Sequence, residues 1–206
     1  MIESLENGLQ IAVYAVCLIV SVVRVLRTEE RTWVVLAFFY GVLALGDLYL
    51  EVFLIFVERS PAFYVSEFSW YASYLFLFLL LRQAMPHEAW RKRRALPWLC
   101  VAFTVGMGAF YLQWGDPVGN LVCALLMGLL MFYSVWGLLW LRGEADRRQT
   151  LLCAAVLTFC AMEYVTWTLS CFFRNDSLLN PYFWADTLTG LSTVLLLPGV
   201  RKAVAA

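Results

Sequence analysis

Long apolar runs separated by short polar joints make up nearly the whole of this chain. Seven predominantly apolar runs, each about as long as a helix needs to cross a bilayer, cover residues 8–26, 32–57, 63–82, 97–113, 118–141, 150–173 and 182–199. The joints leave little space for a soluble catalytic or output domain, and we expect none. We predict an all-α integral membrane protein, a single domain over residues 1–206 that forms a seven-transmembrane-helix bundle. Its location would be the lipid bilayer of the cell membrane, which it crosses several times.

The composition agrees with this prediction. Of the 206 residues, 63% are hydrophobic and 17% aromatic, and the mean hydropathy is +0.75. Ordinary soluble domains are roughly 45–50% apolar, so that class is excluded. The net charge is zero, and we expect no nucleic-acid partner. All six prolines fall at the ends of runs or in joints, so no interrupted helix is expected.

The basic residues gather at alternate joints. Only Arg59 and Arg174 follow the even-numbered runs, and the other thirteen of the fifteen follow the odd-numbered runs: Arg24, Arg27, Arg31, Arg82, Arg91, Lys92, Arg93, Arg94, Arg142, Arg147, Arg148, Arg201 and Lys202. Because loops rich in Lys and Arg stay in the cytoplasm, we expect the N-terminus outside and the C-terminus in the cytoplasm. The basic loops are then the surface available to a cytoplasmic partner.

Acidic side chains interrupt the apolar runs where no Lys or Arg accompanies them. They are Asp47, Glu51, Glu67, Glu163 and Asp186. A carboxylate in hydrocarbon costs several kcal/mol unless it is protonated, paired or hydrated, so such residues mark a functional site by default. At a rise of about 1.5 Å per residue, all five reach the outer third of the membrane, with Glu51 and Glu67 nearest the rim.

Aromatic and hydrogen-bonding residues lie on the same helix faces as these acids. Residues at i, i+3, i+4 and i+7 share a face, and a face turned to lipid would leave each charge unsatisfied. We therefore expect these faces to point into the bundle. The sequence predicts a ligand-binding pocket formed by the five acids together with Tyr40, Trp70, Tyr71, Tyr74, Thr166, Trp167 and Thr189.

Such a pocket suits a cation, because carboxylates and the faces of aromatic rings both attract positive charge. A metal ion held by oxygen ligands is a second option, although no particular metal is indicated. Crowded, buried carboxyl groups can also carry protons near neutral pH. The structural alternative is that protonated carboxyl groups only bond neighbouring helices to one another.

Zinc and other cofactors are not expected. The one histidine, His87, lies in a joint, and the six cysteines are scattered over four runs without a CxxC motif. Whether Cys123 and Cys171, both placed toward the outer side, form a disulfide depends on a distance that the sequence does not give.

A weak internal repeat is also present. Phe63-Tyr-Val-Ser-Glu67 follows Ser60-Pro61 much as Tyr182-Phe-Trp-Ala-Asp186 follows Asn180-Pro181, and a basic residue comes fifteen positions after each acid. We predict that residues 8–82 recur in parallel as residues 118–201, with the helix 97–113 as connector. This 3+1+3 plan resembles that of the sugar carriers and PQ-loop proteins and, more loosely, seven-helix receptors and rhodopsins. The chain has no Pro-Gln dipeptide and no lysine in its seventh run.

Three classes of function remain open. The favoured one is binding of a small cationic solute or metal ion from the outer side, by a small carrier or a receptor-like sensor. The second is an intramembrane lipid hydrolase, because Gly46-Asp47-Leu-Tyr-Leu50 and Ala185-Asp186-Thr-Leu188 resemble the two aspartate motifs of the bacterial vinyl-ether lysophospholipid hydrolases. That resemblance implies acid–base hydrolysis by paired aspartates. The third is a non-catalytic subunit of a membrane complex. We assign no catalytic residue and favour a protein that is not an enzyme.

Overall fold

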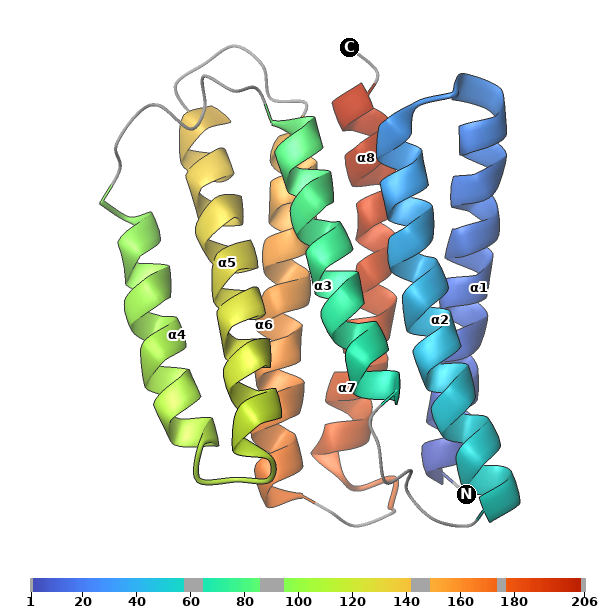
Figure 1. Ribbon diagram of the computed structural model, residues 1–206, viewed down its shortest axis with the longest axis vertical. Coiled ribbons are helices and arrows are strands. Elements are labelled where there is room, and N and C mark those ends of the chain that lie inside the picture. Colours follow the sequence, from blue (N-terminus) through green and yellow to red (C-terminus); the bar gives the residue numbers. More distant parts are fainter. Residues whose placement is uncertain (1, 58–64, 86–94, 142–148, 174–176, 205–206) are drawn as a thin grey trace.

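The computed structural model describes residues 2–57, 65–85, 95–141, 149–173 and 177–204. Within these ranges the chain is helical with no strand (Figure 1), which confirms the prediction of an all-α protein. The helices are α1 (Ile2–Thr28), α2 (Arg31–Val57), α3 (Val65–Ala84), α4 (Pro97–Tyr111), α5 (Pro117–Leu141), α6 (Thr150–Phe172), α7 (Pro181–Ser192), a short 3₁₀ helix η2 (Thr193–Leu195) and α8 (Leu196–Val204).

Two helical segments are longer than the sequence predicts. The first begins at Ile2 rather than at residue 8, and the seventh segment continues through η2 and α8 to Val204 rather than ending at residue 199. In both cases polar residues at the end of the segment hide the helix from a search for apolar runs. Several features used for the sequence predictions lie outside the described residues: His87, the first half of the repeat motif at 60–64, and the basic residues Arg59, Arg91, Lys92, Arg93, Arg94, Arg142, Arg147, Arg148 and Arg174.

Five helical segments are long and apolar enough to cross a membrane. They are Ser4–Thr28, Arg31–Val57, Pro117–Leu139, Thr150–Phe172 and Pro181–Val204. Large apolar side chains project outward from these segments, among them Leu26 at 78% exposure and Phe56 at 80%. Exposed apolar surface of this extent fits lipid and not water, so the structure is that of a multi-pass membrane protein.

The helices stand side by side, and six of them form a ring: α1, α2, α3, α5, α6 and α7. α2 packs between α1 and α3, α6 packs between α5 and α7, and the contacts of α3 with α5 and of α1 with α7 close the ring. α4 packs against α5 on the outside (Figure 1). Successive helical segments run in opposite directions, so α1 begins and α8 ends at opposite ends of the bundle.

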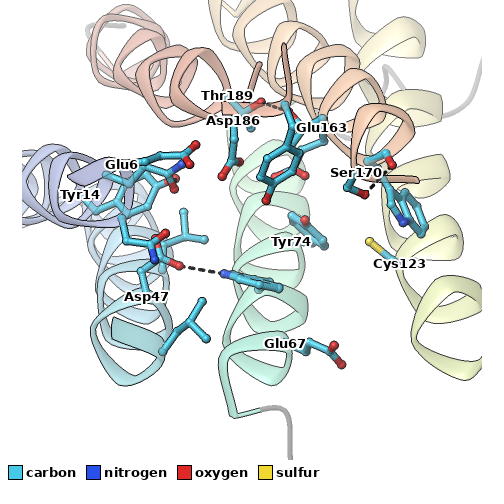
Figure 2. A pocket seen from close by; sticks show the side chains of 18 of the residues that line it. Glu6, Tyr14, Asp47, Glu67, Tyr74, Cys123, Glu163, Ser170, Asp186 and Thr189 are labelled. Carbon is cyan, nitrogen blue, oxygen red and sulfur yellow. Dashed lines mark hydrogen bonds between the residues drawn. The ribbon is translucent and has the colours of Figure 1, made fainter. Parts of the chain in front are cut away.

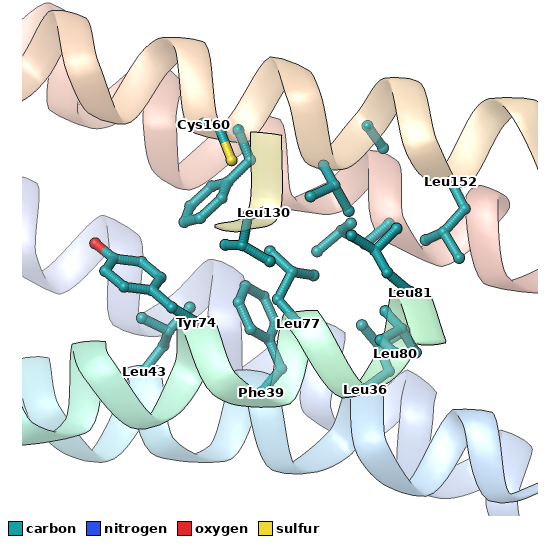
Figure 3. Packing of buried hydrophobic residues seen from close by; sticks show 14 of the residues in the cluster. Leu36, Phe39, Leu43, Tyr74, Leu77, Leu80, Leu81, Leu130, Leu152 and Cys160 are labelled. Carbon is teal, nitrogen blue, oxygen red and sulfur yellow. The ribbon is translucent and has the colours of Figure 1, made fainter. Parts of the chain in front are cut away.

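An apolar core fills the ring in the half of the bundle toward the C-terminal end. Leu36 and Phe39 of α2, Leu77 and Leu81 of α3 and Leu152 of α6 have no exposed surface (Figure 3). The rings of Phe39 and Phe159 meet edge to face at 6.0 Å. This packing closes the ring in that half of the bundle.

The seventh segment contains an interruption, contrary to the expectation from proline positions. Pro198 lies in the first turn of α8 and has no N–H to donate to the carbonyl of Val194, one turn earlier. The hydroxyls of Ser192 and Thr193 bond to carbonyls three residues back, at 2.7 Å each, and so compete with the helical ladder. Three residues tighten into η2 as a result. Tyr40 of α2 donates its hydroxyl to the Thr193 carbonyl at 2.7 Å and stabilises the interruption.

Candidate binding site

A cavity of about 270 Å³ lies inside the ring, toward the end that holds the N-terminus. Five acidic residues line it, and no Lys, Arg or His is among the described lining residues: Glu6, Asp47, Glu67, Glu163 and Asp186 (Figure 2). At roughly 30 Å³ per liquid water molecule, this volume equals about nine waters. Pockets for drug-sized ligands are roughly 300–1,000 Å³, so the cavity fits a solute of only a few heavy atoms.

Ten of the twelve predicted site residues line this cavity. They are Asp47, Glu67, Trp70, Tyr71, Tyr74, Glu163, Thr166, Trp167, Asp186 and Thr189. Tyr40 and Glu51 were predicted with them and do not line it. Tyr40 lies two turns deeper, where its hydroxyl bonds to Thr193, and Glu51 turns toward α1, where its Oε2 accepts from Asn7 Nδ2 at 3.0 Å. Both lie on the same face of α2 as Asp47, but the cavity extends along only part of that face.

Asp47 is held by α3. Its Oδ1 accepts a hydrogen bond from Trp70 Nε1 at 3.0 Å, and only 5% of the residue is exposed. Its Oδ2 is buried with no hydrogen-bond partner. α2 and α3 come this close because of Gly46, where a Cβ would stand 2.7 Å from the Cβ of Ser69. The cavity wall therefore carries one carboxylate oxygen with an unused acceptor position.

Asp186 forms a pair of acids with Glu6. The side chains of Glu6, from α1, and of Tyr182, from its own helix, lie beside it, and Figure 2 shows Glu6 and Asp186 turned toward one another. Glu6 is only 6% exposed. Two carboxylates side by side in a buried site repel one another, so the pair is more stable when one of them carries a proton.

The close approach of α1 to α7 makes this pair of acids possible. At Gly190, one turn after Asp186, a Cβ would lie 3.2 Å from Cγ of Gln10 and 3.4 Å from the Tyr14 hydroxyl oxygen. Tyr14 in turn donates to Gln10 Oε1 at 3.4 Å. A larger residue at position 190 would push α1 outward and separate the two carboxyl groups.

Glu163 occupies the side of the cavity formed by α3 and α6. The Tyr74 side chain lies beside it, and Thr166 and Thr189 join α6 to α7 through a 2.8 Å contact between their hydroxyls. Glu163 interacts electrostatically with both Asp47 and Asp186. Acidic side chains from α2, α6 and α7 therefore line the same cavity.

Aromatic rings form the remaining wall, and α4 helps to hold one of them. Trp167 stacks on Tyr111 of α4 with ring centroids 4.0 Å apart and planes 13° from parallel. The Tyr111 hydroxyl bonds to Thr168 Oγ1 at 2.6 Å and to the Tyr164 carbonyl at 3.2 Å. These bonds fix Tyr111, which in turn restricts the orientation of the Trp167 ring beside the cavity.

The sequence analysis missed the contribution of α1. Glu6, Asn7, Gln10 and Tyr14 all line the cavity, and their spacing of about four residues places them on one helix face. That stripe was a usable signal, but the predicted helix began at residue 8 and left Glu6 in the tail. Five further lining residues were missed on other helices: Leu43, Leu50, Cys123, Ser170 and Tyr182.

The acids surround the cavity and do not converge on one point. Across the part of the chain that the structure describes, no group of three or more His, Cys, Asp or Glu side chains is arranged to hold a metal ion. Within the described residues, no disulfide joins Cys123 to Cys171. The cavity thus presents spread negative charge and aromatic surface to a ligand.

Comparisons with known proteins add no family. No protein-family model, curated protein or solved structure matches the chain. The resemblances to sugar carriers, seven-helix receptors and lysophospholipid hydrolases therefore depend on helix order and two short motifs alone. Function has to be inferred from the cavity itself.

Proposed function

We propose that this protein binds a small organic cation in the acidic, aromatic cavity, reached from the outer side of the cell membrane. The proposal depends on one observation: five carboxyl groups and no described basic residue line a cavity of about 270 Å³. An uncompensated charge in a membrane interior is costly, and a bound cation removes that cost. The size of the cavity limits the ligand to a few heavy atoms.

An organic ammonium fits this wall better than a metal ion. A metal needs several ligand atoms that converge at short distance, and the described residues offer no such group. Trp70 and Trp167 instead place indole rings beside the acids. Ring faces attract ammonium groups, with an energy of about 2 kcal/mol or more where water is excluded.

We propose further that all seven helical segments cross the membrane, with α3 and α4 as the two additional spans. The described basic residues lie at helix ends away from the cavity: Arg24, Arg27, Arg31, Arg82, Arg201 and Lys202. With the positive-inside rule, the cavity then opens to the outside. The neighbour relations also support the 3+1+3 repeat, since α1–α2–α3 and α5–α6–α7 pack in the same order and α4 lies outside the ring.

The packed core beyond the cavity bears on the choice between carrier and receptor-like sensor. Leu36, Phe39 and Leu77 have no exposed surface, so the bundle is closed below the site. A carrier must open that core, whereas a sensor needs only a change transmitted to a cytoplasmic partner at the basic loops. Uptake of labelled choline into proteoliposomes separates the two, because a sensor binds without uptake.

Thermal unfolding of the detergent-purified protein tests the binding itself. Choline is the probe, and 3,3-dimethylbutan-1-ol, its neutral carbon analogue of the same shape, is the control. A ligand that binds only the folded state adds about 2.7 kcal/mol at a hundredfold excess over Kd, so choline should raise the midpoint and the alcohol should not.

Matched acid-to-amide variants complete this test. Asp47→Asn, Glu163→Gln and Asp186→Asn should lose the response to choline, because each removes a charge from the wall. Glu51→Gln makes the same chemical change outside the cavity and should keep the response. Equal shifts with choline and with the alcohol, or an unchanged response in all three cavity variants, contradict cation binding.

A lipid hydrolase is a second candidate, favoured by one observation. Asp47 and Asp186, the acids of the two motifs that resemble the lysophospholipid hydrolases, line the same cavity. Two acids in different environments can divide the roles of general acid and general base. Turnover of a vinyl-ether lysophospholipid by the purified protein, lost in Asp47→Asn and in Asp186→Asn, would favour this candidate over binding.

A further inference from the structure

The pair of Glu6 and Asp186 gives the cavity a proton as well as negative charge. Their carboxyl groups face one another (Figure 2), and two carboxylates that share a buried site repel one another unless one of them is protonated. Glu6 is 6% exposed, and Asp186 lines the cavity. The proton is therefore held where a bound cation would sit beside it.

The groups that face this pair are acidic or neutral on every helix of the ring. They are Tyr14 of α1, Asp47 of α2, Glu67 and Tyr74 of α3, Cys123 of α5, Glu163 of α6 and Tyr182 of α7. None of these described groups can supply a positive charge to the pair. When the cavity holds no cation, a proton is the counter-charge that the pair itself retains, because an uncompensated charge here costs several kcal/mol.

Asp47 supplies an independent sign that the cavity is built for a ligand. Its Oδ2 is buried and has no hydrogen-bond partner, although Oδ1 is bonded to Trp70. A buried acceptor without a partner costs about 1–3 kcal/mol. A cation in the cavity satisfies this oxygen and also attracts the pair of acids from which the proton must leave.

We propose that the cavity is an exchange site, in which a bound cation and the proton shared by Glu6 and Asp186 replace one another. This inference rests on the cation binding proposed above. When one monovalent cation enters, the O–H bond of the pair breaks and the proton leaves to the outer water. The net charge inside the ring stays the same. When the cation leaves, the pair takes up a proton again.

The exchange has a direct consequence for either kind of membrane protein. A carrier built on this site would exchange cations for protons without moving net charge. A sensor would bind its cation about tenfold more tightly for each unit of rising pH while the pair remains protonated, because one proton is released for each cation bound.

Calorimetric titration in several buffers measures the released proton. The purified protein is titrated with methylammonium, tetramethylammonium and choline in phosphate, PIPES and MOPS, whose enthalpies of ionisation differ. The slope of the observed heat against the buffer's ionisation enthalpy gives the number of protons released per cation. We expect a slope near one for the wild type.

Glu6→Gln assigns the proton. Glutamine can still donate a hydrogen bond to Asp186 but has no proton to release, so binding should persist while the slope falls toward zero. Glu51→Gln is the matched control, since it makes the same change on a buried glutamate outside the cavity, and it should keep a slope near one. Infrared difference spectra of the wild type give a readout that needs no variant: the band of a protonated carboxyl group should disappear as the cation binds.

The outcomes separate the exchange from the binding on which it depends. Cation binding with a slope near zero and no loss of the carboxyl band in the wild type overturns the exchange and leaves the binding site in place. A slope near one in both the wild type and Glu6→Gln overturns the assignment to this pair. Absence of heat and of any thermal shift with all three cations overturns both proposals.

Discussion

The hydrogen bond between Trp70 and Asp47 should report the charge of the carboxyl group. Trp70→Phe keeps an aromatic ring in place but removes the indole N–H, which lies 3.0 Å from Asp47 Oδ1. Because Oδ2 has no partner, Asp47 then loses the one donor that the structure gives it. A double-mutant cycle with Asp47→Ala isolates the energy of this pair from the other effects of each substitution.

The expected coupling depends on whether Asp47 is ionised. Bonds to charged groups contribute about 1.5–3 kcal/mol, whereas side-chain bonds between membrane helices average about 0.6 kcal/mol and reach about 1.7 kcal/mol. An N–H donor stabilises the charged form of a carboxyl group more than the neutral form. We therefore expect a coupling near 0.6 kcal/mol in acid that rises to between about 1.5 and 3 kcal/mol as the pH is raised and Asp47 loses its proton.

Reversible unfolding in mixed micelles with increasing SDS provides the measurement. The wild type, the two single variants and the double variant are unfolded at a series of pH values, and the coupling is the departure from additivity. A coupling below about 0.3 kcal/mol at every pH, which is within the usual error of additivity, would show that the bond does not form. A coupling of constant size would show that Asp47 keeps one charge state throughout.

Two further predictions concern the contacts that position the cavity. Gly46→Ala should destabilise the fold by about 1–3 kcal/mol, since its Cβ would lie 2.7 Å from that of Ser69. The control Gly41→Ala meets only an ordinary contact at 3.8 Å and should be neutral or stabilising by up to about 1 kcal/mol. Equal effects of the two substitutions in SDS unfolding would contradict the close approach of α2 and α3. Tyr40→Phe should cost about 0.5–1.5 kcal/mol, because the Thr193 carbonyl at the interruption loses one of its two donors and keeps the Leu196 N–H, and an unchanged unfolding curve would show that water replaces the hydroxyl there.

The start of α1 shows how the chemistry of a residue can hide its role. An apolar run was the signal for each helix, and the residues before position 8 are polar, so the predicted helix began too late. Glu6 nevertheless belongs to α1 and faces the cavity. Its neighbour in the cavity wall, Asp186, lies on a helix that is separated from it by most of the chain.

The two misplaced site residues show the limit of helical periodicity. Tyr40, Asp47 and Glu51 are correctly grouped on one stripe of α2, and all three are buried. Periodicity gives the direction in which a side chain points but not what it meets at each depth. The core at Tyr40 is closed by the seventh segment, and at Glu51 Asn7 of α1 intervenes.

The sequence by itself determined the helical class, the approximate extent of most helices and the acids that have to face inward. These follow from local physics, because lipid forces the backbone to bond within each segment and penalises any outward charge. Only the tertiary structure decided which acids meet. The pairing of Glu6 with Asp186, the unpartnered oxygen of Asp47 and the packed core below the cavity depend on distances of a few ångströms between helices. Those distances are set by small residues such as Gly46 and Gly190 at the contacts, and no single segment contains the information that fixes them.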